Sequence, residues 1–302
     1  MPEKQNFIKK QILEYKSRKR VRLSRSLGGT IMIFIFLAVV GAFMILPILY
    51  SIVQSLKPIN EIFAYPPKFF VRNPTFDNFR QVLRLTDNLY VPFTRYLANS
   101  VGISVIGTAV YVVIASLTAY PLAKVNFPGV VVLSQIIVWT LLFRQEVTAI
   151  PQYIVIAKLG MVDTYWAILL PAMSGTMGVF LMKQFIITAI PDATLEAARI
   201  DGAGEFRIFF RIVMPAVKPA IMTLVIFTFQ SMWNATGVQY VYSEQLKMLP
   251  SVLQTLAAGG IARTGAGSAV GVILMIPPIL VFIISQSSVM ETMSHSGLKL
   301  SG

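Results

Sequence analysis

Residues 190–205 read IPDATLEAARIDGAGE, a charged stretch that stands between two long apolar runs. Two more charged residues, Arg207 and Arg211, follow it closely. Each charged side chain costs about 2.5–3.5 kcal/mol at the centre of a bilayer, so this stretch is excluded from a membrane interior. The apolar runs on either side are suited to that interior. The contrast predicts membrane-spanning helices joined here by a segment that lies in water or against another protein.

The charged stretch itself predicts two short helices. Pro191 suits the start of a helix, Asp192 stands in its first turn, and Gly202 follows its last periodic residue. A second helix is expected from Glu205 to Val213, and it is expected to stop at Pro215. The predicted unit is therefore helix, glycine turn, helix.

The first of these helices has one apolar side, which is formed by Leu195, Ala198 and Ile200. Glu196 is left to pair with Arg199 or to meet a partner. A short helix with small residues suits insertion into a cleft of a cytoplasmic protein. The alternative is an ordinary amphipathic loop, in which that pair is solvated and stabilises the helix by only about 0.3–0.5 kcal/mol.

The composition places most of the chain in a membrane. Of its 302 residues 55% are hydrophobic and 13% are charged, and the mean hydropathy is +0.69. A hydrocarbon core about 30 Å thick requires about 20 mostly apolar residues per helix, and several such windows occur. We predict an all-α membrane protein with six transmembrane helices. The expected spans are residues 30–52, 97–122, 130–142, 166–186, 220–233 and 269–285.

The distribution of basic residues predicts the orientation. The net charge is +13, and eight lysines and arginines between residues 9 and 25 precede the first apolar run. Such a cluster is typical of a cytoplasmic end facing anionic lipid, whereas a nucleic-acid site would interleave it with aromatic residues. Six crossings return the carboxyl terminus to the cytoplasm and place residues 190–215 inside. The first outer loop is also basic, so the charge rule agrees only in part.

The sequence lacks the residues that several kinds of functional site require. There is no cysteine, and His295 is the only histidine, so neither a disulfide framework nor a metal site is expected. No phosphate-binding glycine loop is present to hold ATP. Ser104, Ser116 and Ser134 lie in apolar runs without a base, and helix packing is the role expected for them. We expect no catalytic residues, which argues against an intramembrane enzyme.

An ion-coupled secondary transporter is a further alternative. Such a protein would carry ionisable groups inside its spans and would show two related halves. The predicted spans are almost free of charge, Lys183 is near enough to one end to snorkel, and no repeat is evident. The sequence therefore favours energy supplied by a partner protein.

The order of residues in the charged stretch resembles a known signature. Glu-Ala-Ala at 196–198 is followed by Gly202 and then by Ile212 and Pro215. This resembles the EAA motif of the membrane subunits of ABC importers. Met214 stands where that motif usually has leucine, and the exchange conserves side-chain volume.

The resemblance extends over most of the chain outside its basic start and first outer loop. The matching stretches look like the carbohydrate branch of the family, and in particular the second membrane subunit of maltose permeases. These stretches are residues 150–153, 158–160, 163–166, 233–234, 249–250 and 297–299.

The resemblance implies partners and a place of action. In such importers two membrane subunits pair, two ATPase subunits carry ATP and magnesium, and an external solute-binding protein delivers the cargo. It implies a multi-pass subunit of the bacterial plasma membrane that holds no cofactor and whose partner membrane subunit is a different chain. The residues expected to couple to the ATPase are Glu196, Ala197, Ala198, Asp201 and Gly202.

The resemblance also implies a solute path. The loop after the fifth span is similar in position to the loop that enters the binding protein in this family, although an ordinary outer loop is the alternative. The residues expected on the path or at the binding protein are Gln230, Trp233, Asn234 and Tyr240. In maltose-type systems the partner subunit holds the sugar, so a packing role is the alternative for these side chains.

The cargo implied is a sugar or an oligosaccharide, with a glycerol-phosphate compound as the alternative. The basic outer loop would suit an acidic solute. Four parts of the chain are expected. They are a basic cytoplasmic segment at 1–29, the first transmembrane helix and outer cap loop at 30–96, a permease core with its coupling loop 190–215 at 97–290, and a cytoplasmic tail at 291–302.

Overall fold

The computed structural model describes residues 27–87, 91–260 and 263–297, and these residues contain helices but no strand. It divides into two units, residues 1–50 and 51–302. The described part of the first unit is the helix α2 (Leu27–Ser55), whose last turn belongs to the second unit. This helix carries no charged residue and is long enough to cross a bilayer, as predicted for the first span.

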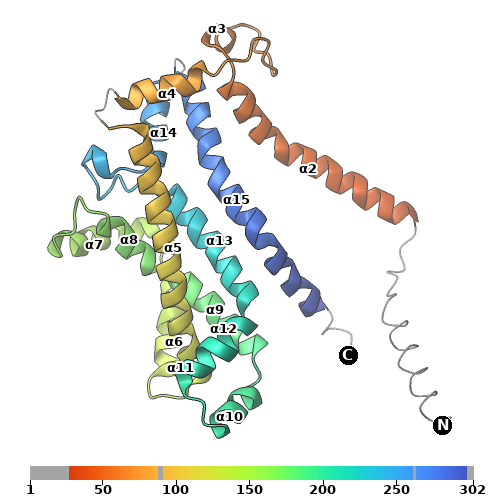
Figure 1. The fold of residues 1–302 in the computed structure, drawn as a ribbon, viewed down its shortest axis with the longest axis vertical. Coiled ribbons are helices and arrows are strands. Elements are labelled where there is room, and N and C mark those ends of the chain that lie inside the picture. Colours follow the sequence, from red (N-terminus) through yellow and green to blue (C-terminus); the bar gives the residue numbers. More distant parts are fainter. Residues whose placement is uncertain (1–26, 88–90, 261–262, 298–302) are drawn as a thin grey trace. The chain divides into compact units, whose positions relative to one another are not determined.

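The second unit has a small cap at one end, built from α3 (Ile59–Ile62) and α4 (Asp77–Asp87) (Figure 1). The buried amide of Asn78 on α4 donates hydrogen bonds of 2.8 Å to the carbonyl oxygens of both Ser55 and Lys57. These two bonds attach α4 to the chain that leaves α2. The cap loop expected within residues 30–96 is therefore an ordered part of the second unit.

Two charged side chains order the loop between α3 and α4. The carboxylate of Glu61 accepts hydrogen bonds from the backbone N–H groups of Arg72 and Asn73, at 3.0 and 2.9 Å. These bonds, that of Arg72 first, lower the pKa of Glu61. The ammonium of the buried Lys57 donates to the carbonyl oxygen of Lys68 at 2.6 Å. At least this basic residue of the predicted outer loop is thus engaged in holding the cap.

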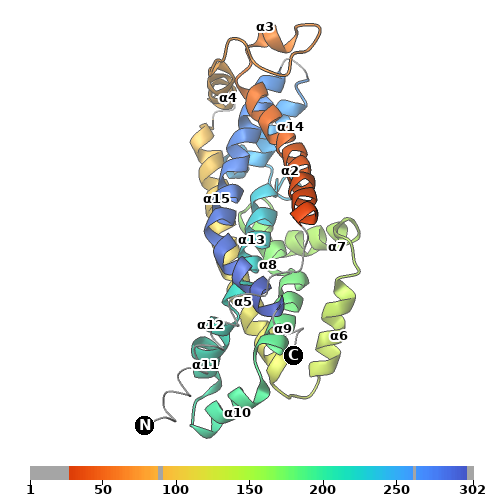
Figure 2. The same ribbon diagram turned by 90° about the vertical axis from the view of Figure 1, so that its right-hand side faces the viewer.

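The centre of the second unit is the long helix α5 (Phe93–Lys124). It packs against α9 (Thr176–Ala189) and α13 (Lys218–Asn234), and α13 packs in turn against α15 (Thr264–Gly297). Figures 1 and 2 show these helices running side by side. Small side chains line the buried face of α5 and allow close helix approach. They are Ser100, Ser104, Thr108, Ala115, Ser116 and Ala119.

Tyr111 of α5 closes a break in the predicted fourth span. That span consists of α8 (Trp166–Met173) and α9, separated by two residues. The Tyr111 hydroxyl donates to the carbonyl oxygen of Gly175 at 2.6 Å and accepts from the N–H of Gly178 at 2.9 Å. Backbone groups freed by the break are thereby satisfied inside the bundle.

The third predicted span is shorter than its sequence window suggested. The helix α6 (Val130–Thr140) has 11 residues, and α7 (Gln145–Lys158) follows it as a separate apolar helix. Eleven residues rise about 16 Å, which is about half of a hydrocarbon core. Among the described residues, four helices are long and apolar enough to cross a membrane, or five if one bent pair is a single span.

The bent pair corrects the prediction that Pro215 ends a helix. The chain runs through α11 (Glu205–Ile208), a π-helical turn (Phe209–Val213) and α12 (Met214–Ala216), and it then bends by 78° into α13. Pro215 lies in α12, directly after the π-helical turn, where the bonding already departs from the regular α-helical pattern. The bend falls at Val217 instead. The helix α15, by contrast, continues through Pro277 and Pro278.

Among its described residues, the chain after α13 contains one short α-helix before α15 begins. The apolar residues at 249–256 form α14 (Leu249–Ala257), which packs on α15 in one cluster with Trp233. The stretch at 257–268 contains four glycines, and α15 already begins within it, at Thr264. The basic start at 1–26 and the last residues of the tail, 298–302, lie outside the described residues.

We predict that Gly178→Val destabilises the protein by about 1–3 kcal/mol through overpacking. A Cβ atom at this position would lie 2.3 Å from the Tyr111 hydroxyl and 2.7 Å from Leu224. Thermal unfolding in detergent, followed by intrinsic fluorescence, measures the loss. The matched control is Gly102→Val on α5, where a Cβ would meet nothing within 4 Å. Equal unfolding temperatures for both variants would contradict this account of the α5–α9 contact.

Candidate functional site

The charged stretch forms the helix α10 (Asp192–Ile200) at the opposite end of the second unit from the cap (Figures 1 and 2). Leu195 anchors this helix, because its side chain is 1% exposed within a cluster that includes Ile186, Ile208 and Phe209. Burial of one leucine contributes about 1.5–3 kcal/mol. The helix is therefore a packed element of the fold.

Only part of the predicted apolar side of α10 is buried. Ala198 lies three residues after Leu195 and packs beside it, whereas Ile200 is 86% exposed. The prediction for Ile200 was wrong. Ile200 is five residues after Leu195, and on a helix this spacing places it on a different face from Leu195 and Ala198. The exposed face of this segment also holds Glu196, Ala197 and, after the turn, Phe206, which is 76% exposed.

Gly202 turns the chain after α10. Its φ is +77°, its N–H donates to the carbonyl oxygen of Arg199, and the N–H of Ala203 donates to that of Ala198, both at 3.0 Å. This is the Schellman arrangement, which requires a left-handed residue at the glycine position. A Cβ at Gly202 would meet nothing within 4 Å, so the backbone conformation is what calls for glycine. Asp201, immediately before it, is exposed.

Two polar ties join α10 and the residues after it to the end of α5. At the start of α10, Asp192 pairs with Lys124 at 2.7 Å. After its end, Glu205 accepts from the Arg199 guanidinium at 2.8 Å and from the Tyr120 hydroxyl at 2.5 Å. These donors, Arg199 first, lower the pKa of Glu205.

These ties correct the predicted pairing on α10. Arg199 meets Glu205 rather than Glu196, which stays exposed. Tyr120 and Lys124 were missed because they stand at the end of an apolar span, where the sequence suggested packing or an interface. The sequence did contain one indication of their role. Tyr120 and Lys124 are four residues apart, and this spacing places both side chains on one face of the helix.

The second predicted group of site residues divides between the core and the surface. Trp233 is 1% exposed, its indole N–H donates to the carbonyl oxygen of Leu274 at 2.8 Å, and its ring stacks on Phe229 at 5.9 Å. These contacts favour the packing alternative for Trp233. Gln230 and Asn234 are exposed on α13.

Asn234 and Tyr240 line one cavity of about 630 Å³, together with Gln152 and Gln239. The Tyr240 hydroxyl donates to the side-chain oxygen of Gln152 at 3.0 Å, and the Tyr240 ring stacks on that of Tyr153 at 6.3 Å. The residues that line this cavity carry amide, hydroxyl and apolar groups but no charge. Such groups donate and accept hydrogen bonds to hydroxyl-bearing solutes.

Asp163 orders the loop that carries Tyr240, and sequence reasoning did not single it out. Its carboxylate accepts from the N–H groups of Tyr242 and Ser243, at 2.9 and 2.8 Å, and from the hydroxyl of Ser243. Its own N–H donates to the carbonyl oxygen of Tyr240 at 2.8 Å. The Ser243 hydroxyl is the first cause of the lowered pKa of Asp163.

Comparison with known proteins decides the family, although no protein-family model matches the chain. The chain is 32% identical over 274 residues to the polygalacturonan/rhamnogalacturonan transport system permease protein YtcP of Bacillus subtilis (strain 168), covering 83% of this chain and 91% of YtcP. It is 30% identical over 258 residues to the sn-glycerol-3-phosphate transport system permease protein UgpE of Pectobacterium atrosepticum, covering 82% and 90%. The chain belongs to the carbohydrate-uptake ABC transporter permease family.

The permease has the same fold as a chain of a solved structure. That structure is of a bacterial ABC transporter involved in the import of the acidic polysaccharide alginate. The TM-score is 0.71 at 24% identity, over 87% of this chain and 98% of that chain. The permease is accordingly a multi-pass protein of the bacterial plasma membrane and a transport subunit rather than an enzyme.

We predict that Asp163→Ala loosens the loop at 237–243, because alanine removes the acceptor and disfavours the observed φ of 60°. Faster cleavage within this loop in limited proteolysis would report the change. Asp163→Asn is the control, since asparagine tolerates this backbone conformation and keeps an acceptor oxygen.

The same loop has an expected pH dependence. A carboxylate with a lowered pKa stabilises the folded loop above its unfolded pKa, and this contribution is lost as the pH falls through the folded value, which lies below 3.8. Protection of the wild-type loop should hence be constant from about pH 8 to about pH 5. A decline in protection between pH 8 and pH 5 would mean that a group other than Asp163 controls the pH dependence of this loop.

Proposed function

We propose that the permease forms half of the translocation path of an ATP-driven importer for a sugar or an oligosaccharide. The observation that carries this proposal is the packed helix α10 with its left-handed Gly202 and its exposed Glu196, Ala197 and Ile200. An apolar surface beside a carboxylate at the end of a membrane bundle suits docking to another protein. The name of the relative YtcP supplies the cargo class, since it is a polygalacturonan/rhamnogalacturonan transport system permease protein.

The partners proposed are those of the family. They are a different second membrane subunit, two ATPase subunits that hold ATP and magnesium, and an external solute-binding protein. The residues proposed to seat on an ATPase subunit are Glu196, Ala197, Ala198, Asp201 and Gly202. Because Ala198 is partly buried against Leu195, its part would be to hold the exposed residues in place.

The ties to α5 support a route for the coupling. Movement of α10 by a closing ATPase would be transmitted through the Lys124–Asp192 pair and the contacts of Glu205. The helices α9 and α13 pack on α5, so a displaced α5 would carry them along. Packed helices move as rigid bodies more readily than they deform, which suits a rocking motion between inward-facing and outward-facing states.

The uncharged cavity beside Asn234 and Tyr240 is proposed as a stretch of the solute path. Its amide and phenol groups suit the hydroxyl groups of a sugar. A glycerol-phosphate compound is a second candidate cargo, and the relative UgpE favours it. A phosphate would be expected to meet a cation, and the lining of this cavity holds none. This cavity thus suits the hydroxyl groups of a carbohydrate better than a phosphate.

We further propose six spans with both termini in the cytoplasm. Four helices and the bent pair account for five crossings, and α6 together with residues up to α7 would supply the other. In this arrangement the cap is outside, α10 is inside, and the boundaries at residues 29, 96 and 290 separate the four expected parts of the chain.

We predict that Ile200→Asp abolishes stimulation of the ATPase by the sugar-loaded binding protein. The side chain is 86% exposed, so the charge should weaken docking without unfolding the permease. The measurement is ATP hydrolysis by the reconstituted complex, with co-purification of the ATPase subunit as a second readout. Leu159→Asp, at a position that is 55% exposed after α7, serves as the control. Full stimulation in the Ile200 variant would refute the proposed role of α10.

The absence of native cysteine makes the topology directly testable. A cysteine placed at exposed Phe70 in the cap should react with a membrane-impermeant thiol reagent in intact cells. A cysteine at exposed Ala193 on α10 should react only after the membrane is opened. The reverse pattern would overturn the proposed orientation.

A further inference from the structure

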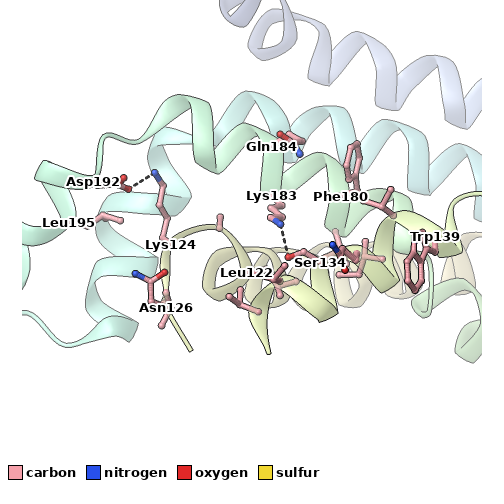
Figure 3. Close-up of a pocket in the computed structure, with 18 of the residues that line it drawn as sticks. Leu122, Lys124, Asn126, Ser134, Trp139, Phe180, Lys183, Gln184, Asp192 and Leu195 are labelled. Carbon is pink, nitrogen blue, oxygen red and sulfur yellow. Dashed lines mark hydrogen bonds and ion pairs between the residues drawn. The ribbon is translucent and has the colours of Figure 1, made fainter. Parts of the chain in front are cut away.

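A second cavity, of about 650 Å³, lies between α6, α9, the end of α5 and α10 (Figure 3). Three basic residues line it, and two of them are neutralised by carboxylates. Lys124 pairs with Asp192 at 2.7 Å, and Arg199 pairs with Glu205 at 2.8 Å. The third is Lys183 on α9.

Lys183 is not balanced by an acidic residue. Its ammonium donates to the hydroxyl of Ser134 on α6 at 2.7 Å, and within the described part of the chain no carboxylate lies within 4.0 Å of it. A neutral hydroxyl accepts a hydrogen bond but leaves the positive charge uncompensated. Lys183 is therefore the basic residue of this lining that has no ion-pair partner among the described residues, and Glu196, a carboxylate of the same lining, pairs with none of the three bases.

Lys183 stands on an apolar helix. It belongs to the apolar stretch Trp166–Ala189, which is long enough to span a membrane. An ionisable residue in such a stretch is by default a sign of function. A lysine that merely snorkels extends along its helix to the membrane surface. Figure 3 shows the ammonium of Lys183 reaching across to α6 instead, into the cavity.

Other groups around this cation suit a sugar. The amides of Asn126, Gln135 and Gln184 line the cavity, and Trp139 and Phe180 lie on the same side of the Lys183–Ser134 bond in Figure 3. Amides bind hydroxyl groups, and aromatic faces pack against the C–H faces of pyranose rings. An ammonium is the group that binds a carboxylate most directly.

We infer that this cavity is an anion subsite for a sugar that bears a carboxylate, with Lys183 as its counter-ion. The inference rests on the proposed import function and narrows the cargo to an acidic carbohydrate. The subsite differs from the cavity beside Tyr240, whose lining is uncharged. A lipid phosphate is the less suitable anion, because recognition of anionic lipid typically uses clusters of basic residues rather than one uncompensated lysine.

The test uses the complete importer in proteoliposomes, with oligogalacturonate and its neutral methyl ester as the probes. We expect Lys183→Gln to lower the uptake of the acid roughly tenfold, the equivalent of one charge-assisted hydrogen bond, and to leave uptake of the ester unchanged. Lys183→Arg should retain the preference for the acid. Lys158→Gln, at an exposed position at the end of α7, is the control. Equal effects of Lys183→Gln on both probes would overturn the inference.

Two further arms separate the remaining outcomes. Uptake is compared in vesicles of phosphatidylcholine with and without phosphatidylglycerol, and an effect of Lys183→Gln that requires phosphatidylglycerol would assign the cavity to lipid and overturn the inference. Neutral oligosaccharides are tested in parallel on the wild type. If it imports these but not oligogalacturonate, the inference fails and the proposed function stands. If it imports no carbohydrate, the proposed function itself fails.

Discussion

The contact of Glu205 with Tyr120 and Arg199 joins the water-exposed segment of the permease to its membrane helices. The segment needs such a tie because its charges exclude it from the bilayer while Leu195 draws it against the bundle. The Lys124–Asp192 pair adds a second tie at the other end of α10. Asp192, Arg199 and Glu205 are exposed to solvent, and pairs with exposed partners contribute about 0–1 kcal/mol each. These pairs therefore matter more for where they hold α10 than for the stability of the protein.

The helix α5 transmits this constraint through the rest of the unit. Its end holds α10, its middle closes the α8–α9 break through Tyr111, and its first half supports the loop after α13. In that first half the Asn99 amide donates to the carbonyl oxygens of Gln245 and Lys247, each at 2.9 Å. A single helix therefore contacts both ends of the proposed path. The two cavities lie along the same helix bundle, one with an uncharged lining and one beside Lys183.

Some features of the fold and site were predictable from local sequence and others were not. Apolar windows without charge predicted most of the spans, and the position of Gly202 predicted the turn after α10. The predictions failed at positions where the local sequence allows a residue either to be buried or exposed, or a helix either to end or to continue. Ile200 is apolar yet exposed, because only the turn from Leu195 to Ala198 of this helix packs against the hydrophobic core. Pro215 remains in a helix because a π-helical turn precedes it.

The sequence alone determined that this protein lies in a membrane and predicted that residues 190–205 lie outside it. The position of Gly202 also predicted the turn at the end of α10. These are consequences of transfer free energy and backbone sterics, which act on each residue and its near neighbours. Only the tertiary structure decided which polar groups meet. Tyr120 and Glu205 are 85 residues apart, Asp163 and Ser243 are 80 apart, and Ser134 and Lys183 are 49 apart. Such pairs depend on how the helices pack, and no local pattern of residues specifies that arrangement.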